Sequence, residues 1–417
     1  MRLRAIASFI ALALIGVTAL TQDPESPPVR TGIDVLRERQ FDLLRGRRVG
    51  LITNPTGIAA DMTSTVDILF NAEGVRLVAL FGPEHGVRGD VEAGKYVETY
   101  NDRATGLPVY SLYGKTRKPT PEMLRGIDVL VYDIQDIGVR SYTYISTMGI
   151  AMEAAAEAGI PFVVLDRPDP LTGAIVSGPM LEPRYKSFVG AYPIPYVYGM
   201  TAGELAEMIN AEGWLNGGQK CSLTVVRMAG WKRSMWWEDT GLEWVATSPH
   251  IPHAGTTLYY VLTGLLGELG TANQGVGYTL PFELIGAPWV RGTELAAYLN
   301  ARNLPGVVFR PMWYRPFYFD TSGIRYEGVQ VHVRDRTRVD LTQVQLHVLA
   351  ALIKLFPEWN ILERARPERL QMFDKVVGTY DVRRWLLAGM EPDDILSRVN
   401  QTRASFMIKR EKYLLYE

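Results

Sequence analysis

Four short runs of β-branched and apolar residues recur along the first half of the chain, and each is typical of a buried strand. They are Val49–Thr53, Leu77–Phe81, Val129–Tyr132 and Phe162–Leu165. Between them lie two segments with helical character, Ser64–Ala72 and Thr143–Ala158, and the second is followed by Gly159, a residue that often ends a helix. The alternation of strand and helix predicts a parallel sheet, so the expected fold class is α/β.

The pattern changes after about residue 250. The chain there contains a glycine-rich stretch at Gly264–Gly277, an aromatic-rich segment at Trp313–Phe319, an alternating run at Gly328–Val333 and two helical stretches near its C-terminus. We therefore predict a first domain over residues 32–250 and a smaller α+β domain over residues 251–417.

The first twenty residues have the pattern of an export signal. Two arginines precede an apolar run from Ala5 to Leu20, which contains a small-residue pattern ending at Ala19 that suits signal peptidase. We predict a signal peptide over residues 1–20, cleaved near Ala19, and a linker over residues 21–31. The mature protein is then expected in the periplasm or outside the cell. The run is short for a membrane span, with an uncleaved anchor as the alternative, and no later membrane segment is expected.

A polar or glycine-bearing motif directly follows each of the four predicted strands. The motifs are Asn54-Pro55-Thr56-Gly57, Gly82-Pro83-Glu84-His85-Gly86, the segment Asp133–Arg140, and Asp166-Arg167-Pro168-Asp169-Pro170. The carboxyl ends of parallel strands share one edge of a sheet, so these loops should converge on one crevice. Turn formation alone could explain the first motif. The third holds two carboxylates, an amide and an arginine within eight residues, which indicates a functional role.

Composition and charge narrow the possible ligands. The chain has 417 residues, and its 44 basic and 45 acidic side chains nearly balance without any dense basic block, so nucleic acid is not an expected partner. The dinucleotide and phosphate-binding glycine motifs are absent, as is the nucleophile elbow of serine hydrolases. His250 and His253 lack an apparent third ligand, so no metal or other cofactor is expected. A nucleotide- or metal-dependent enzyme stays a minor alternative.

The remaining chemistry suits a carbohydrate. The chain has 9 Trp and 21 Tyr, and sugars present apolar faces to aromatic rings and hydroxyl groups to carboxylates. Glycoside cleavage needs one carboxylic acid to protonate the leaving oxygen and a second group to stabilise the positive charge at the sugar. Four tryptophans could form a sugar platform, although each could equally belong to the core: Trp231, Trp236, Trp237 and Trp244.

At these same motifs the sequence resembles the NamZ-like exo-β-N-acetylmuramidases. The resemblance spans nearly the whole chain after the signal segment. It is carried, in order, by Gly50–Gly57, Phe81–Gly86, Asp133–Tyr144, Asp166–Pro168, Tyr198–Thr201, Pro281–Glu283 and Gly286–Trp289. The resemblance implies a Rossmann-like catalytic domain followed by a smaller C-terminal domain. It also implies release of N-acetylmuramic acid from the non-reducing ends of peptidoglycan fragments.

The resemblance places the leading catalytic carboxylate at Glu84, in the Gly-Pro-Glu-His-Gly motif. We expect Glu84 to act as general acid, with His85 orienting or tuning it and with Asp133 or Asp136 acting on the opposite side of the sugar. The substrate's own amide oxygen is an alternative nucleophile.

Polar residues of the same loops are the expected substrate contacts. Muramic acid carries a lactyl carboxylate, for which Arg140, Arg167 or Arg88 offers a planar two-pronged partner, and Arg140 is favoured. The other predicted substrate-binding residues are Asn54, Gln135, Tyr142 and Asp166.

The chain departs from the family pattern at one stretch. Where relatives tend to have Ser-Glu-Gly-Arg-Gly-Thr, this chain has Asn273-Gln274-Gly275-Val276-Gly277-Tyr278, without the carboxylate and the guanidinium. A non-catalytic protein that binds cell-wall fragments is therefore the alternative function.

Overall fold

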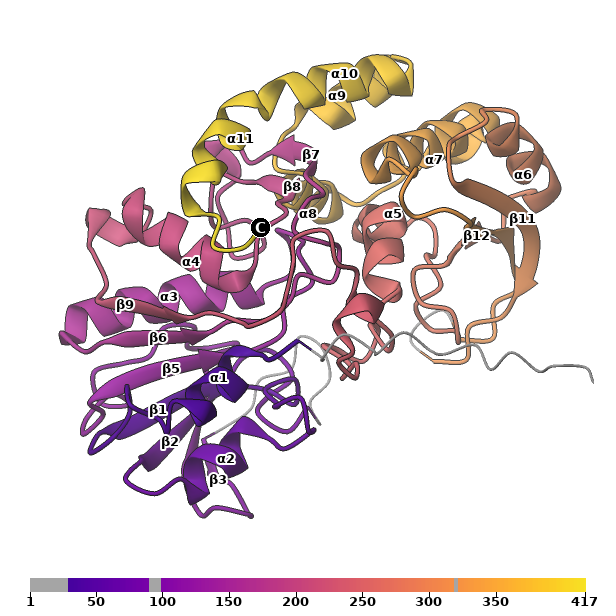
Figure 1. Cartoon of the computed structure of the whole chain (residues 1–417). Coiled ribbons are helices and arrows are strands. Elements are labelled where there is room, and N and C mark those ends of the chain that lie inside the picture. The colour runs from indigo at the N-terminus through magenta and orange to yellow at the C-terminus, as the bar shows by residue number, and fades with distance from the viewer. Residues whose placement is uncertain (1–28, 90–98, 319–321) are drawn as a thin grey trace, which may run out of the picture.

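The structure is a computed structural model that describes residues 29–89, 99–318 and 322–417. It has a larger lobe built around one sheet and a smaller lobe beside it (Figure 1). The predicted signal peptide and most of the predicted linker lie outside the described residues. Within the described part of the chain, no helix has the length and apolar character that crossing a membrane requires.

Within the described residues, a seven-stranded sheet forms the centre of the larger lobe, in the order β3-β4-β2-β1-β5-β6-β9. The strands are β1 (Arg48–Thr53), β2 (Arg76–Gly82), β3 (Tyr100–Asn101), β4 (Pro108–Ser111), β5 (Val129–Asp133), β6 (Phe162–Leu165) and β9 (Leu223–Val226). Neighbouring strands are parallel except β3 and β4. The four predicted strands are the adjacent strands β2, β1, β5 and β6, which confirms the α/β fold class.

Helices cover both faces of this sheet. They are α1 (Gly32–Glu38), α2 (Thr65–Asn71), α3 (Tyr144–Ala158) and α4 (Ala202–Ala211). Side chains alternate along each strand, so Leu51 of β1 joins the hydrophobic cluster that includes Leu69 of α2, whereas Ile52 joins the cluster that includes Met148 of α3. Burial on both faces is the reason that these strands read as continuous apolar runs.

The predicted helix boundaries have the expected capping chemistry. Ser64 precedes α2, and its side chain accepts a hydrogen bond from the Asp67 backbone nitrogen. Thr201 and Glu204 form a capping box at the start of α4. Helix α3 ends at Gly159, whose φ of 67° is readily adopted only by glycine. The sequence therefore predicted the start of α2 and the end of α3 to within a residue or two.

The smaller lobe contains an antiparallel sheet in the order β10-β12-β11. Its strands are β10 (Leu284–Ala287), β11 (Val307–Tyr314) and β12 (Tyr326–Val333), and its helices are α5 (Thr256–Leu269), α6 (Gly292–Asn300) and α7 (Leu341–Leu355). The predicted alternating run lies in β12. In Figure 1, α5 lies between this lobe and the larger one.

More helices follow α7 than the two C-terminal helical stretches that the sequence predicted. They are α8 (Pro367–Val377), α9 (Asp381–Leu387), α10 (Pro392–Thr402) and α11 (Ala404–Arg410). Proline occupies the first position of α8 and of α10, where it needs no hydrogen-bond donor and starts a new helix.

The end of the chain returns to the larger lobe. Helix α10 packs against β7 (Ser177–Met180), which pairs with β8 (Pro195–Val197). Near the C-terminus the Tyr416 hydroxyl donates to Asp166 at 2.6 Å. The predicted domain boundary near residue 250 stays a prediction, and residues on both sides of it contribute to the larger lobe.

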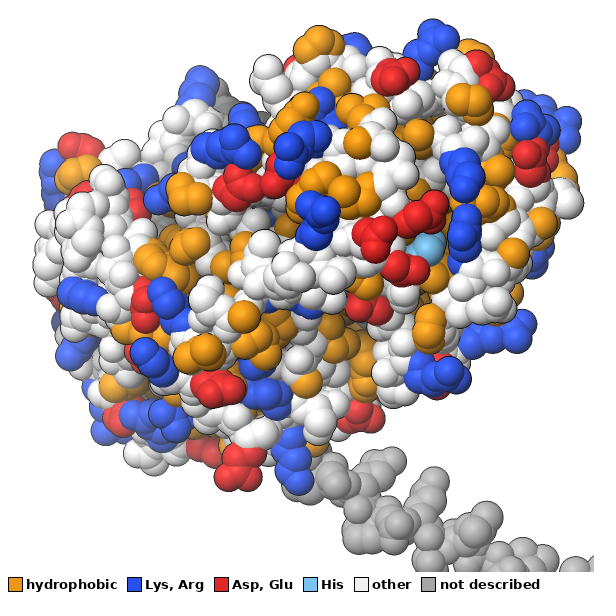
Figure 2. Space-filling model, turned by 90° about the horizontal axis from the view of Figure 1, so that it is seen from above, with side chains coloured by type: hydrophobic (Ala, Val, Ile, Leu, Met, Phe, Trp, Pro, Cys, Tyr) orange, Lys and Arg blue, Asp and Glu red, His pale blue; other side chains and the backbone are white. Residues whose placement is uncertain are grey.

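The face formed by the C-terminal helices carries both signs of charge. Figure 2 shows Lys and Arg side chains interspersed with Asp and Glu side chains over this face. This mixture agrees with the formal net charge of −1.

Candidate active site

A cavity of about 560 Å³ lies beside the turn that follows β2, and residues of both lobes line it. We call it the Glu84 pocket. Its volume is in the range of small-molecule binding sites. Three of the predicted site residues, Glu84, His85 and Tyr142, line it.

The turn after β2 has a backbone that presents Glu84 to this pocket. The Gly86 nitrogen donates to the Pro83 carbonyl at 3.0 Å, and His85 has a φ of 71°. A left-handed conformation is uncommon for residues other than glycine, and such strain tends to occur at functional sites. A Cβ at Gly82 would lie 3.0 Å from the Val87 nitrogen, so the close turn requires glycine there. The Gly-Pro-Glu-His-Gly motif is thus explained by the shape of the turn together with the placement of the carboxylate.

Hydroxyl groups contact the Glu84 carboxylate. Thr143 Oγ1 donates to Glu84 Oε2 at 3.2 Å. The Tyr113 side chain also hydrogen-bonds to Glu84, and burial together with this carboxylate raises the pKa of Tyr113 to about 12. Thr143 directly precedes α3, so the carboxylate lies near the positive end of a 15-residue helix. His85, only 8% exposed, follows Glu84 in the same turn.

Three tyrosines form one wall of the pocket. The rings of Tyr142 and Tyr144 meet edge to face at 5.0 Å, and Tyr142 meets Tyr260 at 6.1 Å. The Tyr142 hydroxyl donates to Thr247 Oγ1 at 2.8 Å, which fixes its ring. Burial raises the pKa of Tyr142, so its hydroxyl stays protonated at neutral pH.

The sequence interpretation missed a second carboxylate, Glu268 of α5, which also lines the pocket. Burial raises its pKa, and the charge of Arg369 opposes that shift. Glu268 is the lone charged residue of α5, whose other members are apolar, tyrosine, threonine or glycine. An isolated charge on an otherwise uncharged and mostly buried helix is a signal that could have identified it.

Two cations of the pocket were also missed. Arg117 lies in the chain between β4 and β5, with its guanidinium 4.1 Å above the Phe188 ring, and Lys375 belongs to α8. Neither residue follows one of the predicted strands. Arg117 follows β4, the neighbour of β2 in the sheet, whereas Lys375 reaches the pocket through α8, which packs against α5.

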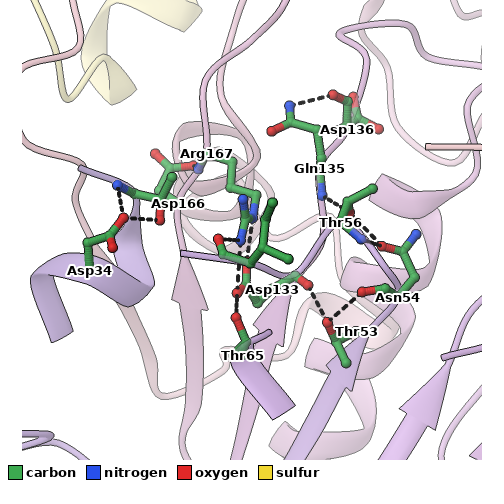
Figure 3. A network of polar contacts seen from close by, with 12 residues as sticks. Asp34, Thr53, Asn54, Thr56, Thr65, Asp133, Gln135, Asp136, Asp166 and Arg167 are labelled. Carbon is green, nitrogen blue, oxygen red and sulfur yellow. Dashed lines mark hydrogen bonds and ion pairs between the residues drawn. The ribbon is translucent and has the colours of Figure 1, made fainter. Parts of the chain in front are cut away.

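Asp133 does not line the Glu84 pocket, so its predicted catalytic role stays a prediction that this geometry does not support. Its side chain is fully buried and forms an ion pair with Arg167, with Nε to Oδ1 at 2.5 Å and Nη2 to Oδ2 at 3.1 Å. The Thr65 hydroxyl donates to it as well. Figure 3 shows Asp133 enclosed by Arg167 and Thr65. Arg167 is therefore engaged with Asp133 and is not placed to bind a substrate carboxylate.

Asp136 and Gln135 connect the strand-end loops to each other. Gln135 Nε2 donates to the Pro168 carbonyl at 2.6 Å, and Asp136 accepts from the Gly138 nitrogen at 2.8 Å and from the Tyr198 hydroxyl. Both side chains are buried and neither lines the Glu84 pocket. The catalytic role of Asp136 and the substrate contact of Gln135 stay predictions, and their observed contacts are structural.

Asn54 and Asp166 are likewise buried in contacts within the protein. Asn54 Oδ1 accepts from the Thr56 nitrogen at 3.0 Å, and its side chain also hydrogen-bonds to Tyr144 of the pocket wall. Asp166 accepts from Thr201 Oγ1 at 2.7 Å and from the Gly203 nitrogen at 2.8 Å. Neither residue lines the pocket. Their observed contacts support the strand-end loops and the start of α4, and their substrate contacts stay predictions.

The favoured lactyl partner, Arg140, lies outside the pocket. It is 0% exposed and donates to four backbone carbonyls, those of Pro179, Ile194, Val376 and Val377, at 2.7 to 2.9 Å. It cannot reach a ligand without losing these bonds. Arg88 forms a bidentate pair with Asp102, with both contacts at 2.9 Å. Neither arginine is placed to bind substrate.

The four tryptophans considered for a sugar platform lie in or against the hydrophobic core, which is the other alternative that the sequence left open. Trp231 and Trp237 are 4% and 6% exposed, and Trp236 and Trp244 pack against the core of the smaller lobe. In the described part of the chain, no group of three or more His, Cys, Asp or Glu side chains is placed to hold a metal ion.

The buried carboxyl of Asp136 leads to a prediction on pH dependence. Burial raises its pKa from the ordinary 3.8 to about 7, so the folded protein holds this proton more tightly than the unfolded chain does. The free energy of unfolding should therefore fall as pH rises from about 4 to about 7, by about 1.4 kcal/mol per unit of pKa shift at most. Asp136→Asn should flatten this decline, as measured by thermal unfolding at pH 5 and pH 8.

A matched control is Asp128→Asn. The hydrogen bonds from Arg48 lower the pKa of Asp128 to about 2, so its titration lies below this window and the decline should persist. A decline of unchanged size in Asp136→Asn would contradict the assignment.

Comparisons with family descriptions and with a curated protein find similarity to the same group of proteins, the β-N-acetylmuramidases. The family description "Exo-beta-N-acetylmuramidase NamZ, N-terminal" matches residues 49–255, and the corresponding C-terminal description matches residues 258–416. The chain is 45% identical over 425 residues to the peptidoglycan beta-N-acetylmuramidase NamZ of Bacillus subtilis, and the alignment covers 100% of both proteins.

Two crystal structures of DUF1343 family proteins from Bacteroides fragilis have the same fold. One superposes with a TM-score of 0.89 at 50% identity and covers 94% of this chain and 99% of its own. The other has a TM-score of 0.76 at 30% identity and covers 93% and 99%.

Proposed function

The chain belongs to the exo-β-N-acetylmuramidase NamZ family, and we propose that the Glu84 pocket is the place where it cleaves its substrate. The protein is a glycoside hydrolase that releases N-acetylmuramic acid from the non-reducing ends of peptidoglycan fragments. The observation that supports the location is a carboxylate on a strained turn, facing a cavity with a tyrosine wall, a second carboxylate and two cations. An enzyme is thereby favoured over a non-catalytic binding protein.

Glu84 serves as general acid in this proposal. Its carboxyl group gives a proton to the glycosidic oxygen while the bond between that oxygen and the sugar carbon breaks. After proton transfer the carboxylate is stabilised by the Thr143 hydroxyl, by Tyr113 and by the nearby N-terminus of α3. These groups are already in place, so little reorganisation accompanies the change of charge.

Glu268 takes the second role, in place of Asp133 and Asp136. It is the other carboxylate among the described lining residues of the pocket. Glu268 can stabilise the positive charge at the sugar directly. Alternatively, it can orient the acetamido group of the substrate, whose oxygen then attacks the sugar carbon. In both routes the ionised Glu268 side chain lowers the barrier by stabilising the positive charge that develops at the sugar.

The lactyl carboxylate of the substrate meets Arg117 and Lys375. These are the arginine and lysine side chains among the described residues that line the pocket. A carboxylate that enters a partly enclosed cavity needs a cationic partner to offset the loss of hydration. The two cations therefore distinguish a muramide from a glucosaminide, which lacks the lactyl group.

This assignment is tested by comparing chromogenic N-acetylmuramide and N-acetylglucosaminide. The wild-type protein should prefer the muramide, and Arg117→Gln or Lys375→Gln should lower the ratio of the two kcat/KM values by about tenfold. Lys118→Gln is the matched control, because Lys118 pairs with Glu157 on the surface and does not line the pocket. A ratio that both pocket variants leave unchanged would refute the lactyl assignment.

We also propose that the protein is exported. The support is the sequence alone, with its basic start and the apolar run from Ala5 to Leu20. N-terminal sequencing of the protein from fractionated cells tests this, and an unprocessed protein in the cytoplasm would contradict it.

A further inference from the structure

A strip of aromatic side chains runs along the smaller lobe. Tyr278 lies 6.1 Å from Phe317, Phe317 lies 5.3 Å from Tyr318, and Tyr318 stacks on His250 at 6.1 Å with an interplanar angle of 6°. We call Tyr278, Phe317 and Tyr318 the aromatic strip. Its members come from two loops far apart in the sequence, so the row of rings exists only in the folded protein.

His250 connects the strip to the surroundings of the Glu84 pocket, because its ring stacks on Tyr318. The pocket-wall residues Tyr142 and Tyr144 both hydrogen-bond to Thr247, which holds the loop leading to His250 against the pocket. His250 also lies close enough to His85 for the two side chains to interact electrostatically. Burial lowers the pKa of His250 most, and the neighbouring His85 lowers it further. The rings therefore form a path that starts at the His85 side of the pocket.

The strip is both exposed and anchored. The fractional exposures of Phe317 and Tyr318 are 60% and 36%. The Phe317 nitrogen donates to the Gly277 carbonyl at 2.8 Å, and Tyr278 packs on the buried Tyr314 at 5.6 Å. Large aromatic rings that are solvent-exposed near a catalytic pocket are suited to binding the apolar face of a ligand.

We propose that the aromatic strip is the binding subsite for the leaving-group sugar, an N-acetylhexosamine attached to the reducing side of the muramic acid. This rests on the proposed function. When an exo-acting glycosidase holds one terminal sugar in its pocket, the rest of the substrate must extend out of the mouth. The C–H groups on one face of a pyranose ring form an apolar surface that packs on aromatic rings. The strip offers such rings next to the pocket.

The test compares two substrates that share the muramic acid and differ in the leaving group. One is the natural disaccharide, and the other is muramyl fluoride, whose leaving group is too small to reach the strip. Phe317→Ala and Tyr318→Ala should lower the ratio of kcat/KM for the disaccharide to that for the fluoride by about tenfold, mainly through KM. Tyr318→Phe retains the ring and should keep most of the wild-type ratio.

Trp313→Ala is the matched control. Trp313 is 48% exposed and lies in β11 beside Tyr314, which faces the strip. Neighbouring residues of a strand point to opposite faces, so Trp313 faces away from the strip. Its removal should leave the ratio unchanged. An equal fall for both substrates in the strip variants, or no fall in either, would overturn the proposal.

A binding measurement separates failure of the subsite from failure of the enzymatic function. Calorimetry with the uncleaved disaccharide and Glu84→Gln protein should give a Kd that Tyr318→Ala raises by about tenfold. If the wild type cleaves neither substrate, the proposed function fails while this measurement still decides on the strip. Unchanged disaccharide binding, with the rings instead mediating self-association in sedimentation, would identify the strip as a contact between copies.

Discussion

Glu84→Gln is expected to lower turnover of the natural disaccharide by about 100-fold or more while the protein remains folded. Glutamine keeps the shape of the side chain and can still accept from the Thr143 hydroxyl, which donates to Glu84 at 3.2 Å. It cannot give a proton to the leaving oxygen. The measurement is kcat on the disaccharide, with thermal unfolding of the variant recorded beside it.

The loss should depend on the leaving group. A chromogenic muramide with a good leaving group needs less protonation, so Glu84→Gln should impair it less than the disaccharide. Glu268→Gln is the informative comparison, because a residue that stabilises charge at the sugar matters for both leaving groups alike. A folded Glu84→Gln protein that cleaves the disaccharide at nearly the wild-type rate would remove Glu84 from the mechanism. Glu268 would then be the next candidate for the acid.

Arg140→Met is expected to lower the free energy of unfolding by about 3 to 5 kcal/mol, the largest loss of stability that we predict. Methionine fills a similar volume but leaves the carbonyls of Pro179, Ile194, Val376 and Val377 without their donor inside the protein. These carbonyls belong to segments of both halves of the chain, so the larger lobe and α8 should separate more readily. Chemical denaturation measures the effect.

Arg140→Lys distinguishes geometry from charge at this position. A lysine ammonium is compact and cannot donate to four carbonyls spread around a planar guanidinium, so the lysine variant should also be destabilised. Arg366→Met is the control, because its ion pair with Glu368 is exposed on the surface and its loss should leave the unfolding midpoint nearly unchanged. A stable Arg140→Met protein would show that the buried guanidinium does not hold these segments together.

Local patterns along the chain predicted the central sheet well. A strand buried on both faces must be apolar at successive positions, and the helices between strands carry their own caps, such as Ser64 and Thr201. The position of Glu84 could also be predicted from the sequence. Its placement depends on a short turn directly after β2, and the residues that shape this turn are its own neighbours.

The roles of the polar residues at the end of β5 could not be predicted in the same way. Asp133 ends β5, and Asp136 and Arg140 follow it at the expected edge of the sheet. The direction of each side chain nevertheless depends on which group lies opposite. Arg167 neutralises Asp133, and Tyr198 and Gly138 bind Asp136. Carbonyls from β7, from the segment before β8 and from α8 surround Arg140. A polar residue at a strand end can serve packing as readily as chemistry, and sequence position alone does not separate the two.

The sequence by itself therefore determined the α/β sheet, its capped helices and the carboxylate on the turn after β2, because each depends on interactions among near neighbours. Only the tertiary structure decided what faces Glu84. Glu268 and Lys375 come from α5 and α8, roughly 180 and 290 residues further along the chain. Their approach depends on how the lobes pack, and Arg140 fastens α8 in place through contacts that no local pattern encodes.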